Sequence, residues 1–220
     1  MLDKMEFVKP GDIEARSMEI ITGELGDTGW KEPELSVVRR CIHTSADFDY
    51  NINLKFSKNA CKKGIMALRN GADIVTDTRM AMAGINKRRL AEHGGQVHCF
   101  IDDETVLREA KERGMTRSAI CMERGAAIKK PVIFVIGNAP TALIRLYELV
   151  QNGEVKPELV IGVPVGFVNV VESKELFMQA DIPWIIAVGR KGGSNVAAAI
   201  CNALLYYKDE VEFERWNELF

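Results

Sequence analysis

This sequence lacks the short motifs by which several common chemistries are recognised. It contains no GxGxxG or GxxxxGKS/T loop for nucleotide phosphates, no GxSxG elbow, no HExxH pair and no CxxC pair. The five cysteines, at positions 41, 61, 99, 121 and 201, are odd in number and scattered. They argue against a disulfide framework or a zinc site and favour a reducing cytoplasm. His93 and His98 have no acidic or cysteine partner at ligand spacing, so we expect no metal site.

The sequence also lacks a strong excess of one charge and a long apolar run. Twenty-nine basic residues against thirty-one acidic ones leave a net charge of −2, which predicts binding to neither nucleic acid nor a membrane. No apolar run reaches the length of a membrane span, and the first residues do not form a signal peptide. With 220 residues, 47% of them hydrophobic, we expect one globular domain over residues 1–220, located in the cytoplasm.

What the sequence does contain is a pattern that occurs three times. Residues 132–136 are consecutive apolar side chains, which predict a strand buried on both faces. A Gly-Asn-Ala-Pro loop and a helical pattern follow, and the runs at 159–167 and 184–194 repeat this arrangement with glycine-rich loops. Three strand–loop–helix units in succession predict a parallel sheet whose strand ends share one ligand-facing edge.

Further elements are expected on both sides of these units. The predicted strands lie at 73–76, 96–101, 132–136, 159–162 and 184–188. Residues 12–25 predict an amphipathic helix, with Asp12 as its N-cap and a buried stripe of Ile13, Ile20, Ile21 and Leu25. A second helix is expected from Glu34 to about His43, and a third after Ser57 as its cap. Residues 54–56 predict a short extended piece, and residues 206–220 an amphipathic cover or a dimer contact.

Several residues are candidates for function, each with a plainer alternative. Arg40 and His43 are spaced i,i+3 near the end of a helix and are therefore neighbours on one surface. Histidine exchanges protons near neutral pH, but at a helix end it is more often a structural cap, so the residue types alone leave both roles open. Arg117 begins a helix, where a cation is misplaced unless an anion meets it. Ser17, inside the first helix, is ordinarily expected to bond to a carbonyl or to water.

Loops at the strand ends supply further candidates for binding an anion. Residues 77–79 place an acid, a hydroxyl and Arg79 at one such end, and residues 189–194 combine glycines with two cations. This composition suits a carboxylate or a phosphate, although glycine-rich turns often exist only because the backbone needs a positive φ. The residues by themselves predict an α/β protein that binds an anionic organic molecule.

Six segments, in order along the chain, together resemble the precorrin-8X methylmutase family, which includes the cobalt-precorrin-8 enzymes. They are residues 39–50 (RRCIHTSADFDY), 75–80 (VTDTRM), 116–118 (TRS), 136–143 (IGNAPTAL), 161–167 (IGVPVGF) and 189–194 (GRKGGS). Each motif alone is weak, whereas six in series across residues 10–205 make a specific match.

The resemblance implies an isomerase of cobalamin biosynthesis that moves a methyl group from C-11 to C-12 of a corrinoid, (cobalt-)precorrin-8, giving hydrogenobyrinate or cobyrinate. It implies a three-layer α/β/α, flavodoxin-like fold with a five-stranded parallel sheet, N-terminal helices that contribute to the active site, and a homodimer. His43 is then the catalytic proton donor and acceptor, and Ser17, Arg40 and Arg117 bind the substrate. Because the reaction is an isomerisation, no redox cofactor, metal or methyl donor is required.

Two other interpretations stay open beside this one. A non-catalytic protein that retains and hands on a tetrapyrrole is disfavoured by the presence of His43 together with Arg40. An unrelated nucleotide or phosphate enzyme on the same fold is disfavoured by the missing phosphate motifs. Further candidates for substrate contacts are Asn138, Thr141, Arg79 and residues 189–194, and the loop 136–141 is expected to offer backbone donors to a substrate carboxylate.

Overall fold

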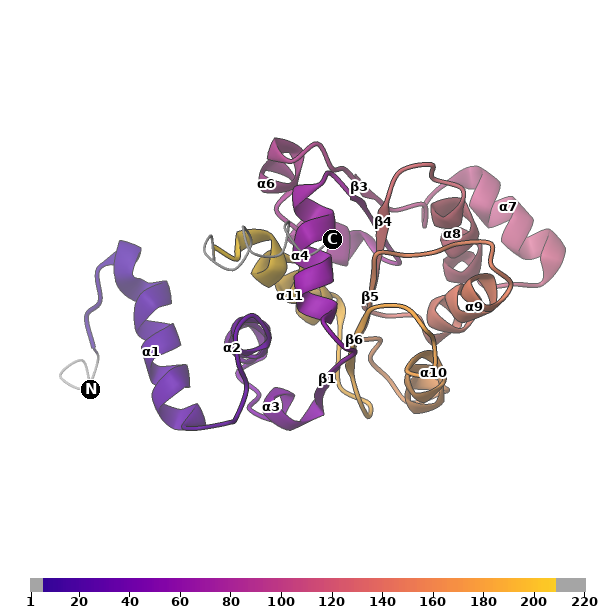
Figure 1. The fold of residues 1–220 in the computed structure, drawn as a ribbon. Coiled ribbons are helices and arrows are strands. Elements are labelled where there is room, and N and C mark those ends of the chain that lie inside the picture. Colours follow the sequence, from indigo (N-terminus) through magenta and orange to yellow (C-terminus); the bar gives the residue numbers. More distant parts are fainter. Residues whose placement is uncertain (1–5, 209–220) are drawn as a thin grey trace.

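The computed structural model describes residues 6–208, which form a central sheet with helices on both faces (Figure 1). The sheet has six strands in the order β1-β6-β5-β4-β2-β3. These strands are β1 (Leu54–Phe56), β2 (Asp73–Thr76), β3 (Val97–His98), β4 (Val132–Ile136), β5 (Leu159–Gly162) and β6 (Trp184–Ala187). All neighbouring pairs are parallel except β1 with β6. No helix within residues 6–208 combines the length and the apolar character that crossing a membrane requires.

The prediction of a five-stranded, wholly parallel sheet is wrong, because β1 adds an antiparallel strand at one edge. Leu54 of β1 lies opposite Ala187 of β6. Three residues carry too little pattern to indicate a strand, so this pairing depends on the neighbouring strand rather than on local sequence. Ser57 continues the pairing instead of capping a helix. Its N–H donates to the Trp184 carbonyl at 3.0 Å, and its hydroxyl accepts the Trp184 N–H at 2.8 Å.

The parallel strands follow their apolar runs, although β3 is shorter than the predicted 96–101. Side chains that alternate along each strand enter two separate cores. In β4, Ile133 and Val135 join the core on one face, whereas Phe134 and Ile136 join the core on the other. Both faces of the sheet are buried, which explains why the strand sequences show no polar alternation.

Helices form the two outer layers. They are α1 (Ile13–Leu25), α2 (Glu34–Ser45), α3 (Tyr50–Asn53), α4 (Ala60–Arg69), α5 (Arg79–Gly84), α6 (Lys87–Glu92), α7 (Glu104–Arg113), α8 (Arg117–Ala126), α9 (Pro140–Gln151), α10 (Val170–Phe177) and α11 (Ser194–Tyr206). Residues of α2, α4, α6 and α11 belong to one core, and residues of α7, α8, α9 and α10 to the other. The expected tail at 206–220 lies, beyond Lys208, outside the described residues.

The first helix differs from its prediction in how it is buried. α1 packs on α2 at the margin of the molecule (Figure 1). Ile21 is buried there, but Ile13 and Ile20 are 53% and 43% exposed. Asp12 lies in a 3₁₀ turn and makes no cap hydrogen bond. An amphipathic pattern thus located the helix correctly but did not show that part of its apolar face stays uncovered.

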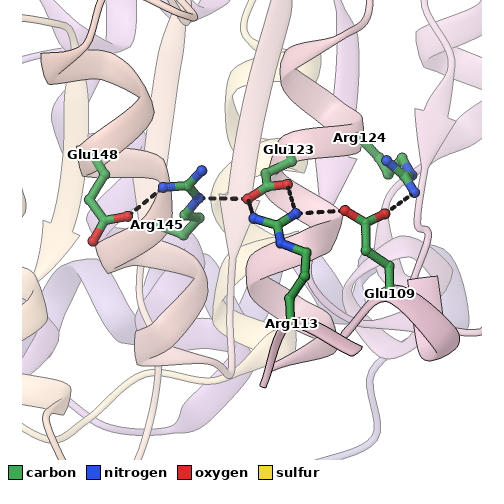
Figure 2. Close-up of polar contacts among 6 residues, drawn as sticks. All are labelled: Glu109, Arg113, Glu123, Arg124, Arg145 and Glu148. Atoms are coloured by element: carbon green, nitrogen blue, oxygen red, sulfur yellow. Dashed lines mark hydrogen bonds and ion pairs between the residues drawn. The ribbon is translucent and has the colours of Figure 1, made fainter. Parts of the chain in front are cut away.

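Helices α7, α8 and α9 are joined by a network of six charged side chains (Figure 2). Its members are Glu109, Arg113, Glu123, Arg124, Arg145 and Glu148. Arg113 of α7 donates to Glu123 of α8 at 2.6 and 2.9 Å, and Arg145 of α9 donates to the same carboxylate at 2.8 Å. The hydrogen bonds from Arg113 lower the pKa of Glu123 below its ordinary value. The network connects α8, which begins at Arg117, to both neighbouring helices.

Candidate active site

A cavity of about 660 Å³ opens beside the last turn of α2. His43 lies in its wall, and Arg40 lies there one turn earlier on the same helix. The remaining wall comes from α1, α5 and α11 and includes Glu14, Gly84, Asn195, Asn202 and Tyr206. The structure therefore brings the histidine and the arginine predicted as neighbours to one cavity, with α1 and α2 on one side of it.

The end of α2 is closed without help from the His43 imidazole. Ala46 adopts the left-handed conformation, and its N–H donates to the Ile42 carbonyl at 2.7 Å. The Ser45 hydroxyl donates to the Cys41 carbonyl at the same distance. Within residues 6–208 the exposed His43 side chain has no hydrogen-bond partner. The geometry thus gives no support to a structural cap and leaves both ring nitrogens available to a ligand.

Arg40 and Ser17 are both held by groups of the protein itself. Arg40 Nη1 lies 2.7 Å from Glu14 Oε1 on α1. A ligand carboxylate that binds this guanidinium has to compete with that glutamate. The Ser17 hydroxyl donates to the Ile13 carbonyl at 2.9 Å, the ordinary behaviour of a serine inside a helix. Ser17 is also absent from the wall of the cavity, so its predicted contact with substrate stays a prediction.

A second cavity of about 460 Å³ shares Arg40, Tyr206 and Lys208 with the first. Arg39 adds a further cation to its wall, which also contains Glu32. The Nε of Arg39 is buried and has no hydrogen-bond partner among residues 6–208. The volume next to His43 therefore suits the anionic side chains of a large ligand better than an apolar one.

Arg117 stands apart from this region. It begins α8 as predicted, and Thr116 caps that helix by accepting the Ala119 N–H at 3.2 Å. Its exposed guanidinium donates to the Ile101 carbonyl at 3.5 Å and pairs with no acid among the described residues. α8 packs in one core of the sheet and α2, which carries His43, in the other, and Arg117 is not among the residues that line the His43 cavity.

The strand order reverses between β2 and β4, and the carboxyl ends of such strands form the usual ligand crevice of an α/β sheet. Here Asp77 occupies that position. Its carboxylate accepts the N–H groups of Gly137 at 2.9 Å, Asn138 at 2.8 Å and Ala139 at 2.8 Å. Burial raises the pKa of Asp77, while the three N–H groups oppose that shift. These backbone donors are therefore not available to a substrate carboxylate, and the expectation that the loop offers them is wrong.

The loop that follows β6 is tied to the turn that follows α2. The Lys191 ammonium lies 2.6 Å from both the Asp47 and the Asp49 carboxylates. The hydrogen bond from Lys191 lowers the pKa of Asp47. From the interior, the Lys174 ammonium donates to the carbonyls of Gly189 and Lys191 at 2.8 Å each. The loop at 189–193 is thus held between α10 and the turn that follows α2.

Sequence reasoning missed the role of Lys174, although a signal was present. Val170, Lys174 and Phe177 are spaced i, i+4 and i+7 and therefore share the face of α10 that is buried. Arg79, another predicted candidate, donates to the Asp102 carboxylate at 2.6 Å. Within residues 6–208 no three His, Cys, Asp or Glu side chains are grouped so that they could hold a metal ion.

Comparison with known proteins finds relatives that match nearly the whole chain. The family model described as CbiC: Precorrin-8X methylmutase matches residues 12–207. The cobalt-precorrin-8 methylmutase of Salmonella typhimurium is 46% identical over 216 residues, which cover 94% of this chain and 100% of the relative. That of Priestia megaterium is 44% identical over 202 residues, covering 92% and 90%. The solved precorrin-8X methyl mutase of Thermus thermophilus matches with a TM-score of 0.81 and 38% identity, over 88% of this chain and 96% of that chain.

Proposed function

The chain belongs to the precorrin-8X methylmutase family, and we propose that it moves a methyl group from C-11 to C-12 of precorrin-8 or cobalt-precorrin-8. The product is hydrogenobyrinate or its cobalt form, cobyrinate. The observation that carries this proposal is the shared cavity of His43 and Arg40, which combines a proton-exchanging group with an anion-binding one. The free thiols at all five cysteines fit the cytoplasmic location that we propose.

His43 acts in this proposal as the proton donor and acceptor. Protonation of a ring nitrogen makes the conjugated macrocycle an electron sink and eases migration of the methyl group. The proton returns to the imidazole after the shift, so atoms and charges are the same before and after the reaction. An imidazole suits this exchange because histidine ordinarily titrates near neutral pH. The unpartnered position of His43 in the cavity wall leaves room for a ring nitrogen to meet it.

The substrate has several carboxylates at its rim, and arginines are the side chains best suited to bind them. Arg40 is placed to take one such carboxylate next to His43 once Glu14 is displaced. Arg117 is exposed and unpaired with any acid among the described residues, which suits a second one. We assign Ser17 to the same task, because a small rotation frees its hydroxyl from the Ile13 carbonyl.

We also propose a homodimer in which His43 of one copy and Arg117 of the other face the same substrate. Two observations support it: α1 leaves Ile13 and Ile20 exposed, and Arg117 is not among the residues that line the His43 cavity. Mixing the His43→Ala and Arg117→Ala proteins under conditions that exchange subunits should then restore activity. A monomer in sedimentation equilibrium, or no restoration on mixing, contradicts this arrangement.

The test of the catalytic assignment compares His43→Ala with His93→Ala, a histidine at the end of α6 and outside the cavity. Each protein is incubated with the methylated precursor, and product is followed by its visible absorption. We expect His43→Ala to bind the corrinoid but to lose methyl transfer, and His93→Ala to retain it. Methyl migration at the wild-type rate in His43→Ala contradicts the assignment, and a wild-type protein that binds without converting is a carrier rather than an enzyme.

A further inference from the structure

Lys174 is a buried cation that pairs with no acid among the residues that the structure describes. Its side chain is completely buried, and its ammonium donates only to the carbonyls of Gly189 and Lys191 among residues 6–208. Burial lowers its pKa to about 8. A buried charge without a counter-ion is costly, so a protein that keeps one gains something other than stability from it. The two carbonyls that Lys174 binds indicate what the buried ammonium contributes.

Each carbonyl that Lys174 binds fixes the direction of a neighbouring N–H group. The Gly189 carbonyl belongs to the same peptide group as the Arg190 N–H, and the Lys191 carbonyl to the same group as the Gly192 N–H. In a trans peptide the oxygen and the hydrogen point in opposite directions, so both N–H groups point away from Lys174. Arg190 is exposed and Gly192 partly exposed, and neither N–H has an acceptor within residues 6–208.

The two cationic side chains beside these N–H groups, Lys191 and Arg190, differ in whether an acid neutralises them. Lys191 is engaged by Asp47 and Asp49. Arg190 has no acidic partner among the described residues, and its guanidinium lies over the Phe167 ring at 5.4 Å from the centroid. Two outward-pointing N–H groups on either side of Lys191, beside a guanidinium that pairs with no acid among the described residues and with a buried ammonium behind them, are donors suited to an anion.

Gly192 keeps the loop in this shape. Its φ is +159°, and a Cβ at this position would lie 2.2 Å from the Val163 carbonyl oxygen. The next N–H, that of Gly193, donates to the same Val163 carbonyl at 2.9 Å. The loop is therefore anchored on the strand-end segment after β5 from one side and on Lys174 from the other. It leads directly into Asn195, which lines the His43 cavity.

We propose that the Arg190 and Gly192 N–H groups, with the Arg190 guanidinium, bind a rim carboxylate of the corrinoid substrate next to the His43 cavity. This inference rests on the proposed function and adds a binding site to it. Lys174 is a positioning residue in this site: it does not touch the substrate, but its ammonium orients the two peptide groups that do. The site favours a carboxylate over a neutral amide or ester, because the Arg190 guanidinium is charged and a hydrogen bond between two ions is stronger than one to a neutral carbonyl.

The direct test observes the two backbone amides in the wild-type protein. Hydrogenobyrinate is titrated into ¹⁵N-labelled protein, and its fully esterified form is used in parallel. We expect the Arg190 and Gly192 amide resonances to shift downfield with the acid and to stay in place with the ester. Unshifted resonances under saturation with the acid overturn the site.

Variants give the second arm of the experiment. Arg190→Gln should weaken hydrogenobyrinate binding by about 10- to 100-fold, the loss expected for one charge-assisted hydrogen bond. Lys174→Met should weaken it similarly while His43 still turns over bound substrate, so that KM rises more than kcat falls. Arg108→Gln, an exposed arginine on α7, is the matched control. If the wild type converts substrate and Arg190→Gln binds it equally well, this site is wrong and the proposed function stands. If the wild type neither binds nor converts it, the proposed function itself fails.

Discussion

The carboxylate of Asp77 lies 2.8 Å from the backbone nitrogen of Ala139, the residue that precedes α9. The side chain of Ala139 cannot cap the helix, and Asp77, at the end of β2, instead accepts the N–H groups of Ala139 and the two residues before it. An acid of the protein thus fills the crevice at the strand reversal, where α/β proteins commonly bind a ligand. The anion sites that we propose therefore lie elsewhere, around Arg40 and the loop after β6.

Asp77→Asn tests how much this contact stabilises the fold. The amide keeps one acceptor oxygen and turns donor hydrogens toward backbone N–H groups, so at least one buried donor loses its partner. We expect the free energy of unfolding to fall by about 1–3 kcal/mol in urea denaturation. Asp102→Asn removes the exposed ion pair with Arg79 and should cost clearly less, because solvent screens that pair. Equal losses in the two variants contradict a stabilising role for the three buried hydrogen bonds of Asp77.

The network in Figure 2 makes Glu123→Gln a second stability prediction. Glu123 is 17% exposed and accepts from both Arg113 and Arg145, so its loss should cost about 1–3 kcal/mol. Glu92→Gln, which breaks one exposed pair with Arg89, is the control. Because the folded-state pKa of Glu123 is lowered, the wild-type advantage exists above the ordinary glutamate pKa of about 4.3 and disappears as pH falls through the folded value. An advantage that persists in acid contradicts this origin.

Glu14→Gln tests the competition for Arg40. Removing the charge of Glu14 leaves the guanidinium free to meet a substrate carboxylate. The exposed pair stabilises the free enzyme by no more than about 1 kcal/mol, so KM should fall by up to about fivefold while kcat stays unchanged. Steady-state kinetics with Glu19→Gln as the control, which loses a contact with Arg16 instead, measure this effect. A higher KM in Glu14→Gln shows that Glu14 assists binding rather than opposing it.

Arg117→Ala should weaken corrinoid binding by about tenfold without lowering the thermal midpoint. The reason is that the exposed guanidinium has a single long contact, 3.5 Å to the Ile101 carbonyl, and supports no packing that the fold requires. Absorbance titration gives the affinity, and Arg108→Ala on the neighbouring helix is the control. An unchanged affinity removes Arg117 from the site.

Lys174 predicts an unusual dependence of stability on pH. Its folded pKa is about 8, whereas an unfolded lysine titrates near 10.4. Between these values the unfolded chain holds a proton that the folded protein has released, so the contribution of this residue to stability rises with pH. From about pH 7 to 10.5 the wild type should gain on the order of 3 kcal/mol relative to Lys174→Met. Lys63→Met, at an exposed lysine, is the control, and a flat difference contradicts the burial of the charge.

Much of the fold follows from local pattern. Apolar runs such as 132–136 located the parallel strands, because strands buried on both faces carry no polar residue to obscure them. The spacing of Arg40 and His43 was sufficient to place them together, because neighbours on a helix are determined by its pitch. Of the four predicted site residues, His43 and Arg40 line the first cavity, whereas Ser17 and Arg117 lie outside its wall.

Only the tertiary structure shows the contacts that join residues distant in sequence. The sequence by itself determined that the chain forms an α/β protein with a histidine and an arginine on one helix face, since both properties repeat within a few residues. It could not show that β1 pairs with β6, that Asp77 takes the N–H groups of 137–139, or that Lys174 supports the loop at 189–193. Each of these contacts joins segments that meet only when the sheet has formed. The local sequence of one segment does not indicate which distant segment will lie beside it.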